Sequence, residues 1–563
     1  MRIFFLFLGL LLLFGESQGQ NVLYDNLEPA YIQLLPDQEI TFQLEVNGPN
    51  YALLETCWDQ GAALMTVTQG DSVLKKRTLR GRGRNFTPLQ TDRAGAIQIR
   101  FAVLEPLQGE VALRRQEPLA TSPEKRVDQI MAPYREPGMP GAQIAVVAQG
   151  QTVLAKGYGL ANVEHEIPFT PSTLTDIGSL AKQFTAFAIA LLAEDGQLSL
   201  DDRLRQYFPD SPEFADSITI RYLIHHTSGL REIYTMKAIA GFPREGIRQE
   251  EARELLYYSE ALNFAPGSQF LYCNTSYMLL ADIVEQVTDQ RFESFMQERV
   301  FRPLGMTNTF IMDVQGETFP LRADSYSFSG SSQLRQVYDV SSAYGQGGIY
   351  TSMDDLVRWL NNLRTGQVGG SSVRERMTQR GVLRSGDTLD YAFGLFVDDW
   401  RGYRRIAHGG SSAGYRAYLA YFPEADLGIL IKGNYAGLRP QSLADQLAKV
   451  YLPELQPKSN EPEPHSRQSE PLKVPTDQMD RLTGRYFTPE LEVFYDIVRV
   501  GDQLSIKNRI VGDQRLIPIG KNRWKTDQGT ITFFEQAGQI AGFRMDAGRV
   551  KRLRFVRQSR FRE

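Results

Sequence analysis

Three short motifs follow one another along this chain of 563 residues, and their residue types could together perform acyl transfer. They are Ser179-Leu-Ala-Lys182, Tyr272-Cys-Asn274 and His408-Gly409-Gly410. A serine hydroxyl becomes a nucleophile when a neighbouring base takes its proton, and backbone N–H groups can then stabilise the oxyanion. Each motif is weak by itself, so their order and surroundings carry the prediction.

The serine and the lysine of the first motif are predicted to share one face of a helix. Apolar residues recur with helical spacing at 180, 184, 187, 188, 191 and 192, and Asp195-Gly196 is a stop signal. Ser179 falls in the first turn, where free N–H groups favour negative charge, and Lys182 lies one turn further on. Burial would lower the pKa of Lys182, so that its amine could accept the serine proton.

The second motif lies in a loop that is expected to enter a helix near Thr275. In an extended segment Tyr272 and Asn274 point to the same side, toward one cleft. A nearby ammonium could lower the pKa of Tyr272 and make it a general base. The amide of Asn274 can donate and accept, which suits holding a substrate amide or the lysine.

Residues 406–423 are expected to form two strands around a glycine-rich corner. Glycines such as Gly409 and Gly410 let a substrate approach the backbone closely. The N–H of Ser411 could pair with the N–H of Ser179 to hold an oxyanion. His408 would stand on the wall of the cleft.

Other segments match these patterns in the wrong context. Ser72–Lys75 lies in a stretch with strand-like alternation, which would splay the two side chains apart. In Ser122–Lys125, the serine precedes a proline and a periodic run, which is typical of a helix N-cap. Tyr24–Asn26 also fits Tyr-x-Asn.

A rival serine motif, Gly410-Ser-Ser-Ala-Gly414, matches the nucleophile elbow of α/β-hydrolases. That fold needs an acid and then a histidine after the serine. The histidine that follows Ser412 is His465, in a polar stretch rich in Pro and Glu, so this alternative is disfavoured.

Taken together, the motifs resemble the serine β-lactamase and penicillin-binding-protein superfamily, and within it the class C-like branch with its D-aminopeptidase, D-alanyl-D-alanine carboxypeptidase and esterase members. The resemblance covers roughly residues 118–455. It extends to four further segments, at 196–202, 218–230, 303–307 and 347–352.

The resemblance implies an α+β catalytic domain in which an antiparallel sheet packs against helices. It implies that Ser179 is acylated, that Lys182 and Tyr272 move protons and that Asn274 binds substrate. The backbone at Ser179 and Ser411 would form the oxyanion hole, with His408, Gly409 and Gly410 beside the substrate.

One departure from the family pattern bears on the substrate. The β-lactamases and transpeptidases usually carry a lysine where this chain has His408, and that lysine supplies a positive charge for the substrate carboxylate. A histidine is only partly charged near neutral pH, so this recognition should weaken. The His-x-Gly pattern is similar to the D-aminopeptidase members, and we therefore rank β-lactam hydrolysis below amide or ester hydrolysis.

Composition excludes several other functions. Hydrophobic content of 42% and charged content of 23% are globular values, and the net charge of −4 argues against a nucleic-acid-binding protein. The sequence has no zinc-type or dinucleotide motif in a suitable context, so neither a metal nor another cofactor is implied. His225 and His226 are expected to pack a turn, and Cys57 and Cys273 to be free thiols in different domains.

The ends of the chain suggest an exported protein of several domains. Residues 1–19 have a positive start, an apolar core and small residues before Gln20, which is typical of a secretory signal peptide and not of a lasting membrane span. The mature protein is then expected in a periplasm or outside the cell.

Domains with strand-like patterns flank the catalytic region. Residues 20–117 predict a small β-sandwich-like domain and 118–455 the catalytic domain. Residues 456–476 have the composition of a linker, and 477–563 predict a small antiparallel, lipocalin-like barrel with turns at 501–502, 512–513 and 547–548.

The leading hypothesis is an exported serine hydrolase that acts on short D-amino-acid peptides or small esters through an acyl-enzyme. One alternative is a β-lactamase of the same fold. The other is a non-catalytic protein that binds cell-wall peptides. The oligomeric state is left open.

Overall fold

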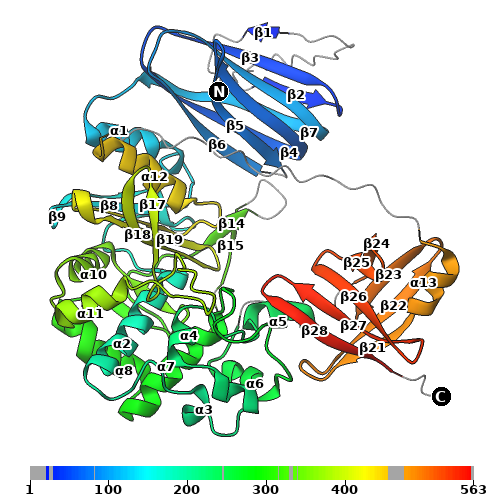
Figure 1. Ribbon diagram of the computed structural model, residues 1–563. Coiled ribbons are helices and arrows are strands. Elements are labelled where there is room, and N and C mark those ends of the chain that lie inside the picture. Colours follow the sequence, from blue (N-terminus) through cyan, green and yellow to red (C-terminus); the bar gives the residue numbers. More distant parts are fainter. Residues whose placement is uncertain are drawn as a thin grey trace, which may run out of the picture.

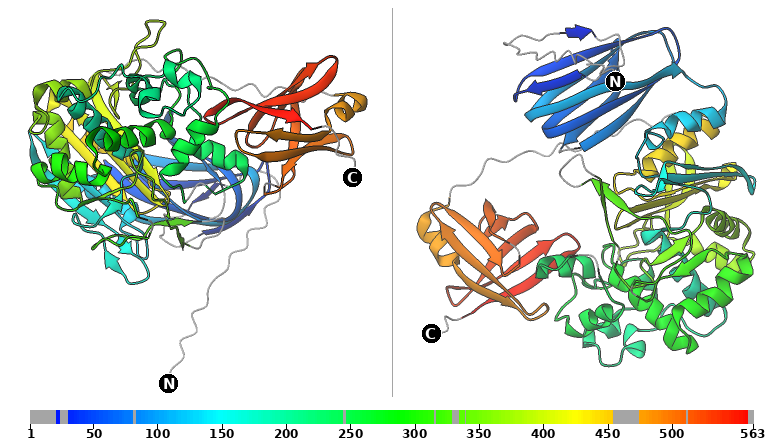
Figure 2. Two further views of the ribbon diagram at one scale, coloured as in Figure 1. Left: turned by 90° about the horizontal axis from the view of Figure 1, so that it is seen from below. Right: turned by 180° about the vertical axis from the view of Figure 1, so that it is seen from behind.

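The computed structural model describes residues 21–23, 30–80, 83–243, 246–314, 316–328, 334–338, 340–453, 474–510 and 512–558. The expected signal peptide (1–19), Tyr24–Asn26, His465 and most of the expected linker (456–476) lie outside the described residues. Figures 1 and 2 show an N-terminal strand domain and a C-terminal barrel attached at separate places to a larger central domain.

The N-terminal domain is a sheet built around two long strands. Its strands are β1 (Asn21–Leu23), β2 (Ala30–Leu34), β3 (Glu39–Val46), β4 (Asn50–Gln69), β5 (Ser72–Arg80), β6 (Gly83–Thr91) and β7 (Gly95–Pro118). The first half of β4 pairs with β6 and its second half with β5, while β7 pairs with β4 along both halves.

Both halves of these strands contribute to one apolar core, which includes Leu54, Trp58, Met65 and Phe101. A strand-rich domain is thus present where the sequence predicted one, as a single seven-stranded sheet. The register between β4 and β7 shifts at Gly61, where an added Cβ would lie 2.1 Å from the carbonyl oxygen of Pro106. Ser72 begins β5, so the Ser72–Lys75 match is part of a strand, as expected.

The central domain contains a six-stranded antiparallel sheet in the order β17-β18-β19-β20-β8-β9. Its strands are β8 (Ala142–Ala148), β9 (Gln151–Tyr158), β17 (Phe396–Trp400), β18 (Tyr403–Ser412), β19 (Tyr415–Phe422) and β20 (Leu427–Gly433). Shorter strands are β10 (Leu160–Asn162), β11 (Ile167–Pro168), β12 (Thr175–Asp176), β13 (Thr309–Ile311), β14 (Tyr326–Phe328), β15 (Leu334–Gln336) and β16 (Ile349–Thr351).

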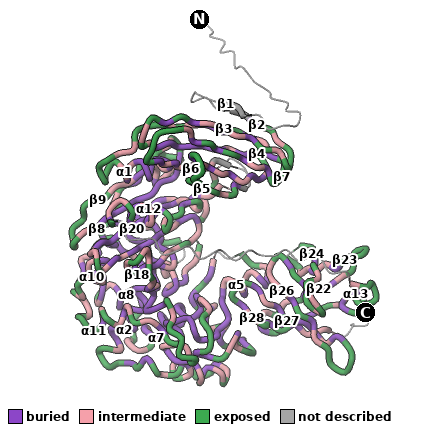
Figure 3. The backbone as a smooth tube through the Cα atoms, turned by 45° about the horizontal axis from the view of Figure 1, so that its top comes forward, coloured by how far each residue is buried: buried purple, intermediate pink, exposed green. Residues whose placement is uncertain are grey.

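Both faces of the six-stranded sheet are buried, because helices cover each of them. On β19, Leu419 faces one apolar core and Tyr418 and Ala420 face the other. The first core is formed mainly with α2 (Lys182–Glu194) and α7 (Asn274–Thr288), and the second with α1 (Pro123–Ile130) and α12 (Pro440–Tyr451). Figure 3 shows these central segments largely in the buried colour.

The remaining helical segments belong mostly to the side of α2 and α7. They are α3 (Leu204–Tyr207), α4 (Ile220–Ile224), α5 (Ile233–Ala240), α6 (Glu250–Tyr258), α8 (Phe292–Met296), α9 (Arg302–Leu304), α10 (Met353–Thr365), α11 (Gly370–Met377) and the short turns η1 (Ala132–Tyr134), η2 (Gly178–Ala181), η3 (Glu213–Ser217), η4 (Gln297–Phe301) and η5 (Pro423–Ala425). α1 begins at Pro123 with Ser122 at its N-cap position, as predicted, although the serine side chain makes no capping hydrogen bond.

The C-terminal domain is a closed antiparallel barrel. Its elements are α13 (Thr476–Leu482), β21 (Gly484–Thr488), β22 (Val493–Val500), β23 (Gln503–Asn508), β24 (Gln514–Gly520), β25 (Arg523–Lys525), β26 (Gly529–Gln536), β27 (Gln539–Ala547) and β28 (Val550–Arg557). Val474 already packs against the barrel core, within the last residues of the expected linker. Gly548 and Arg549 form the turn between β27 and β28, close to the predicted position.

Candidate active site

Ser179 is held against β18 by a tight backbone turn. β12 ends at Asp176, whose carboxylate accepts a hydrogen bond of 2.7 Å from the N–H of Gly178. Gly178 has φ +52°, and a Cβ there would lie 2.5 Å from the backbone nitrogen of Ser411. A glycine is therefore required, because both the left-handed backbone and the close approach exclude a side chain.

The helix start predicted at Ser179 is wrong in one respect. Ser179 lies in the 3₁₀ turn η2, and the α-helix α2 begins at Lys182. The Asp176–Gly178 contact tightens the chain before α2, so the first turn has 3₁₀ geometry. The helix ends before Asp195-Gly196, as predicted.

Lys182 is wholly buried below Ser179. Its Nζ lies 3.1 Å from Ser179 Oγ, and it donates to Asn274 Oδ1 and to the backbone oxygen of Gln346, each at 2.8 Å. Burial, followed by the charge of Arg549, holds the pKa of Lys182 well below its ordinary value, as the sequence predicted for burial. The neutral amine that a proton acceptor requires is thus favoured.

Asn274 begins α7 and links Lys182 to a carboxylate. Its Oδ1 accepts from Lys182, and its Nδ2 donates to Glu232 Oε1 at 2.7 Å. The other oxygen of Glu232 accepts from the N–H and the hydroxyl of Thr235 at 2.9 and 2.7 Å, at the start of α5. Both polar groups of Asn274 are therefore used in positioning the lysine, the second of the two roles expected for it.

Sequence reasoning missed Glu232. The residue is 1% exposed and lies 42 positions before Asn274. Its one local signal was the Glu-x-x-Thr pattern at the start of a helix, because a carboxylate at this position can cap the helix.

Tyr272 lies on the extended segment before α7, as predicted. His226 accepts a hydrogen bond of 3.1 Å from the N–H of Cys273 at its Nδ1, and its ring packs on Tyr272 at a centroid distance of 4.1 Å. This holds the segment in place. The prediction that His226 packs a turn is confirmed, and His225 likewise bonds to the backbone of Arg221.

The expected lowering of the Tyr272 pKa is wrong. Burial of the hydroxyl raises the pKa, and this outweighs the lowering by Ser179 and Arg549. Within the part of the chain that the structure describes, the buried Tyr272 hydroxyl makes no hydrogen bond that meets the distance and angle criteria. Tyr272 therefore carries its proton in this arrangement and is better suited to relaying a proton than to starting the reaction as a base.

The glycine-rich corner lies against the turn that carries Ser179. A Cβ on Gly410 would lie 1.8 Å from the carbonyl oxygen of Ile177, whereas one on Gly409 would meet Tyr418 only at an ordinary 3.5 Å. The backbone nitrogen of Ser411 lies beside Gly178, so the two N–H groups predicted to hold an oxyanion come from adjacent segments.

The rival nucleophile-elbow motif is excluded. Ser412 ends β18, which turns directly into β19 as an antiparallel hairpin. An elbow requires a turn from a strand into a helix.

His408 is more deeply placed than predicted. It is 3% exposed, so it does not stand on an open cleft wall. Its Nδ1 lies 2.6 Å from the backbone oxygen of Gly409 and its Nε2 lies 3.3 Å from the Tyr391 hydroxyl, which assigns the proton to Nδ1. Burial and then the charge of Lys182 lower its pKa to about 3, so the ring is neutral at neutral pH.

Arg549 reaches this site from the C-terminal barrel. Its guanidinium carbon lies 4.6 Å from the centroid of the Tyr272 ring. The turn between β27 and β28 that carries it lies beside α5 in Figures 1 and 2. No local pattern predicted this placement, because the two residues are joined only through the packing of separate domains.

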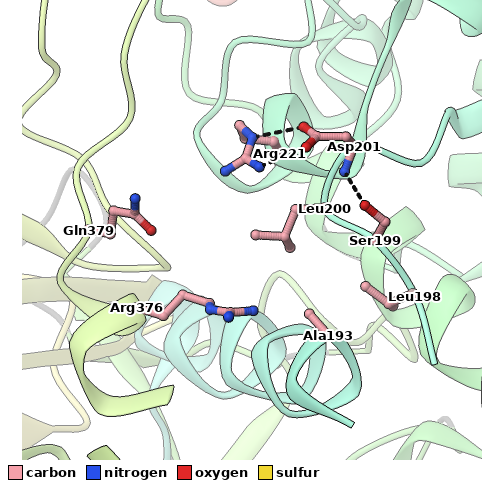
Figure 4. A pocket seen from close by; sticks show the side chains of 8 residues that line it. All are labelled: Ala193, Leu198, Ser199, Leu200, Asp201, Arg221, Arg376 and Gln379. Carbon is pink, nitrogen blue, oxygen red and sulfur yellow. Dashed lines mark hydrogen bonds and ion pairs between the residues drawn. The ribbon is translucent and has the colours of Figure 1, made fainter. Parts of the chain in front are cut away.

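Other features of the described residues lie apart from this site. A cavity of about 390 Å³ opens at the far end of α2, lined by Ala193, Leu198, Ser199, Leu200, Asp201, Arg221, Arg376 and Gln379 (Figure 4). Its Arg221–Asp201 ion pair spans 3.0 Å. Cys57 and Cys273 are not joined by a disulfide, as predicted.

Within the described ranges, no cluster of histidine, cysteine and acidic side chains has the makings of a metal site. In the same part of the chain, every helix is too short or too polar to span a bilayer.

A known protein family matches the domain that holds this site. The Beta-lactamase family model matches residues 124–466, which is more than half of the chain, and the chain therefore belongs to that family. The predicted superfamily and its fold are confirmed.

Curated relatives include D-aminopeptidases. That of Gluconobacter oxydans is 30% identical over 330 residues, which cover 57% of this chain and 61% of the relative. That of Brucella anthropi is 29% identical over 302 residues, covering 53% of this chain and 56% of the relative. The matches thus span less than two thirds of either relative.

Solved structures share the fold. An octameric penicillin-binding protein homologue from Pyrococcus abyssi aligns with a TM-score of 0.52 and 23% identity, covering 77% of this chain and 99% of its own. A D-amino acid amidase from Ochrobactrum anthropi aligns with a TM-score of 0.50 and 21% identity, covering 58% and 98%.

Proposed function

We propose that this protein is a serine hydrolase that cleaves amide bonds through an acyl-enzyme on Ser179. The observation that carries the proposal is the placement of a wholly buried Lys182 amine 3.1 Å from the Ser179 hydroxyl. The D-aminopeptidase relatives support short peptides of D-amino acids as the substrate class. Small esters are a further substrate class, because the same attack applies to an ester carbonyl.

The residues divide the reaction into two halves. As Ser179 Oγ attacks the carbonyl carbon, its proton moves to the neutral amine of Lys182. The backbone N–H groups of Ser179 and Ser411 hold the oxyanion. The C–N bond then breaks, and the proton passes from Lys182 through the Tyr272 hydroxyl to the leaving amine.

Water completes the cycle. It gives a proton to Lys182 as it attacks the acyl ester, and the bond to Ser179 Oγ breaks while the serine regains its proton. Asn274 and Glu232 keep the lysine in place throughout, since they remain bonded to each other and to Lys182.

β-Lactam hydrolysis is expected to be slow. The neutral, buried His408 offers no positive charge at the sheet position where β-lactamases usually carry a lysine for the substrate carboxylate. A high turnover of either drug class by the purified protein would contradict this ranking.

Export to a periplasm or the cell exterior is also part of the proposal. It rests on the signal-peptide pattern of residues 1–19. N-terminal sequencing of the protein secreted by an expression host would test it: cleavage before Gln20 supports export, and an intact Met1 in the cytosol contradicts it.

The decisive experiment is intact mass spectrometry after exposure to an activated p-nitrophenyl ester and, separately, to a penicillin. An adduct on the wild-type protein that is missing from Ser179→Ala would support the nucleophile. Rapid decay of that adduct would support a hydrolase, whereas a stable adduct would favour the peptide-binding alternative. No adduct with either reagent would contradict the proposal.

A further inference from the structure

We infer that Arg549 of the C-terminal barrel binds a free carboxylate of the substrate, on the residue that follows the scissile bond. This rests on the proposed function, and it assigns to the barrel a direct part in substrate selection. The chemistry is that of an exposed guanidinium, which recognises a carboxylate through two parallel hydrogen bonds.

The first observation is that this guanidinium is available. Arg549 is exposed, and among the described residues no carboxylate lies within ion-pair distance of it. The buried acid of the site, Glu232, is already bonded to Asn274 and Thr235. A ligand carboxylate therefore meets no competing anion there.

The second observation is that the hairpin is built to hold the arginine in place. The backbone oxygen of Arg549 accepts from Asn263 Nδ2 at 3.3 Å, and the N–H of Lys551 donates to Asn263 Oδ1 at 2.8 Å. Arg231 also donates to the backbone oxygen of Lys551 at 2.6 Å. The backbone on both sides of the turn is thus fixed to the central domain.

A buried ion pair fastens the same hairpin more firmly. Arg231 forms two hydrogen bonds of 2.8 Å with the carboxylate of Glu490 in the barrel, and both side chains are 2% exposed. Arg231 therefore joins β28 and the β21–β22 connection at one point, so that the reach of Arg549 over Tyr272 is set by buried contacts.

The third observation is the charge balance of the site. His408 is neutral at the sheet position where β-lactamases and transpeptidases usually carry a lysine, so the positive charge beside Tyr272 comes from Arg549. A substrate ammonium beside Arg549 would be repelled, whereas a carboxylate would be attracted. Because Arg549 lies over the face of Tyr272, in the same site as Ser179, we assign the bound carboxylate to the residue that follows the scissile bond.

The test compares two dipeptides that differ in one charge. They are D-alanyl-D-alanine and its C-terminal amide. The released products are measured by chromatography, at a pH high enough that a further increase in pH no longer raises the rate of hydrolysis. Wild-type protein should prefer the free acid. Arg549→Ala should lose at least tenfold in kcat/KM for the acid and less than twofold for the amide, and Arg549→Lys should recover part of the loss.

A matched control is Arg552→Ala, which removes an exposed positive charge from the same hairpin; it should leave both rates unchanged. Equal losses of Arg549→Ala on both dipeptides would overturn the inference, as would a wild-type preference for the amide. Acylation of the wild type by an uncharged p-nitrophenyl ester separates the two claims: if acylation occurs without any carboxylate preference, only this inference fails.

Discussion

Arg231 and Glu490 lie 259 positions apart in the sequence, yet they form a two-pronged ion pair that is almost fully shielded from water. One residue belongs to the central domain and the other to the barrel. The pair therefore couples the stability of the interface to two individual side chains.

Glu490→Gln should destabilise the barrel interface by about 3–5 kcal/mol, because it leaves a buried guanidinium without its counter-charge. Urea unfolding and limited proteolysis between the central domain and the barrel would measure the loss. The exposed pair Arg485–Asp496 is the control, since Asp496→Asn should cost less than about 1 kcal/mol. Similar effects of both changes would contradict the role given to Glu490.

Lys182→Met should reduce acylation by roughly 10²–10⁴-fold, because it removes the group that accepts the Ser179 proton. Rapid measurement of p-nitrophenol release gives the acylation rate. Lys432 is a matched control, since it is another wholly buried lysine but bonds to the backbone of Thr173 and Thr351. Lys432→Met should keep the acylation rate of the folded fraction; a loss as large as that of Lys182→Met would count against a specific role.

Arg549→Ala should move the acidic limb of the pH profile to higher pH. The reaction needs Lys182 in its neutral form, which exists above the lysine pKa. Arg549 lowers that pKa, so its removal raises it, and a higher pH is then needed for the same activity. The limb is measured as kcat/KM for an uncharged ester; an unchanged or lower midpoint would show that Arg549 does not act on Lys182.

Lowering the pH should reduce the free energy of unfolding of the central domain, in part because of His408. The pKa of this histidine is lowered from 6.5 to about 3, so between these values the unfolded chain takes up a proton that the folded chain does not. Stability from this group is complete above pH 6.5 and falls by about 1.4 kcal/mol per pH unit below it. His225, with a pKa lowered to about 4 by burial, adds to the effect.

His408→Gln should therefore lose less stability than the wild type between pH 7 and pH 5, by about 2 kcal/mol. Urea unfolding followed by circular dichroism at the two pH values gives the difference. The exposed His165 is the control, and His165→Gln should behave like the wild type. If His408→Gln and the wild type lost the same stability between pH 7 and pH 5, His408 would not be a cause of the acid destabilisation.

Gly410→Ala should lower kcat/KM by about 100-fold, because its methyl group would force the Ile177 carbonyl and the following Ser179 out of position. Gly409→Ala is the neighbouring control, and its methyl group meets only an ordinary contact with Tyr418. Kinetics of both variants with one ester would test this. Comparable activity of the two would contradict the close approach of β18 to the nucleophile turn.

The parts of the site that sequence could predict depend on short separations. Ser179 and Lys182 are three positions apart, so any helical turn brings them together. The glycine-rich corner at 406–423 likewise indicated the β18–β19 hairpin. The fold class followed from motifs with fixed spacing. The exact turn type at Ser179 did not, because it depends on the Asp176 carboxylate and on contact with β18.

What sequence could not supply came from packing between distant segments. Glu232 meets Asn274 only because α5 and α7 lie together, and Arg549 meets Tyr272 only because the barrel docks beside them. The depth of His408 depends on Tyr391 and Phe396, which cover its ring. The sign of the Tyr272 pKa shift follows from the same burial, which no local pattern reports.

The β27–β28 hairpin of the barrel places substrate recognition on a different domain from bond cleavage, whereas a single-domain hydrolase must carry out both in one domain. The nucleophile and its lysine sit in a crowded interior where almost every substitution disturbs several neighbours. The charge at the mouth sits on an exposed turn held by its backbone, so its side chain can change without loss of those anchors. Substrate preference in such a chain can change over evolutionary time through one or two codons of this hairpin, while the chemical centre stays the same.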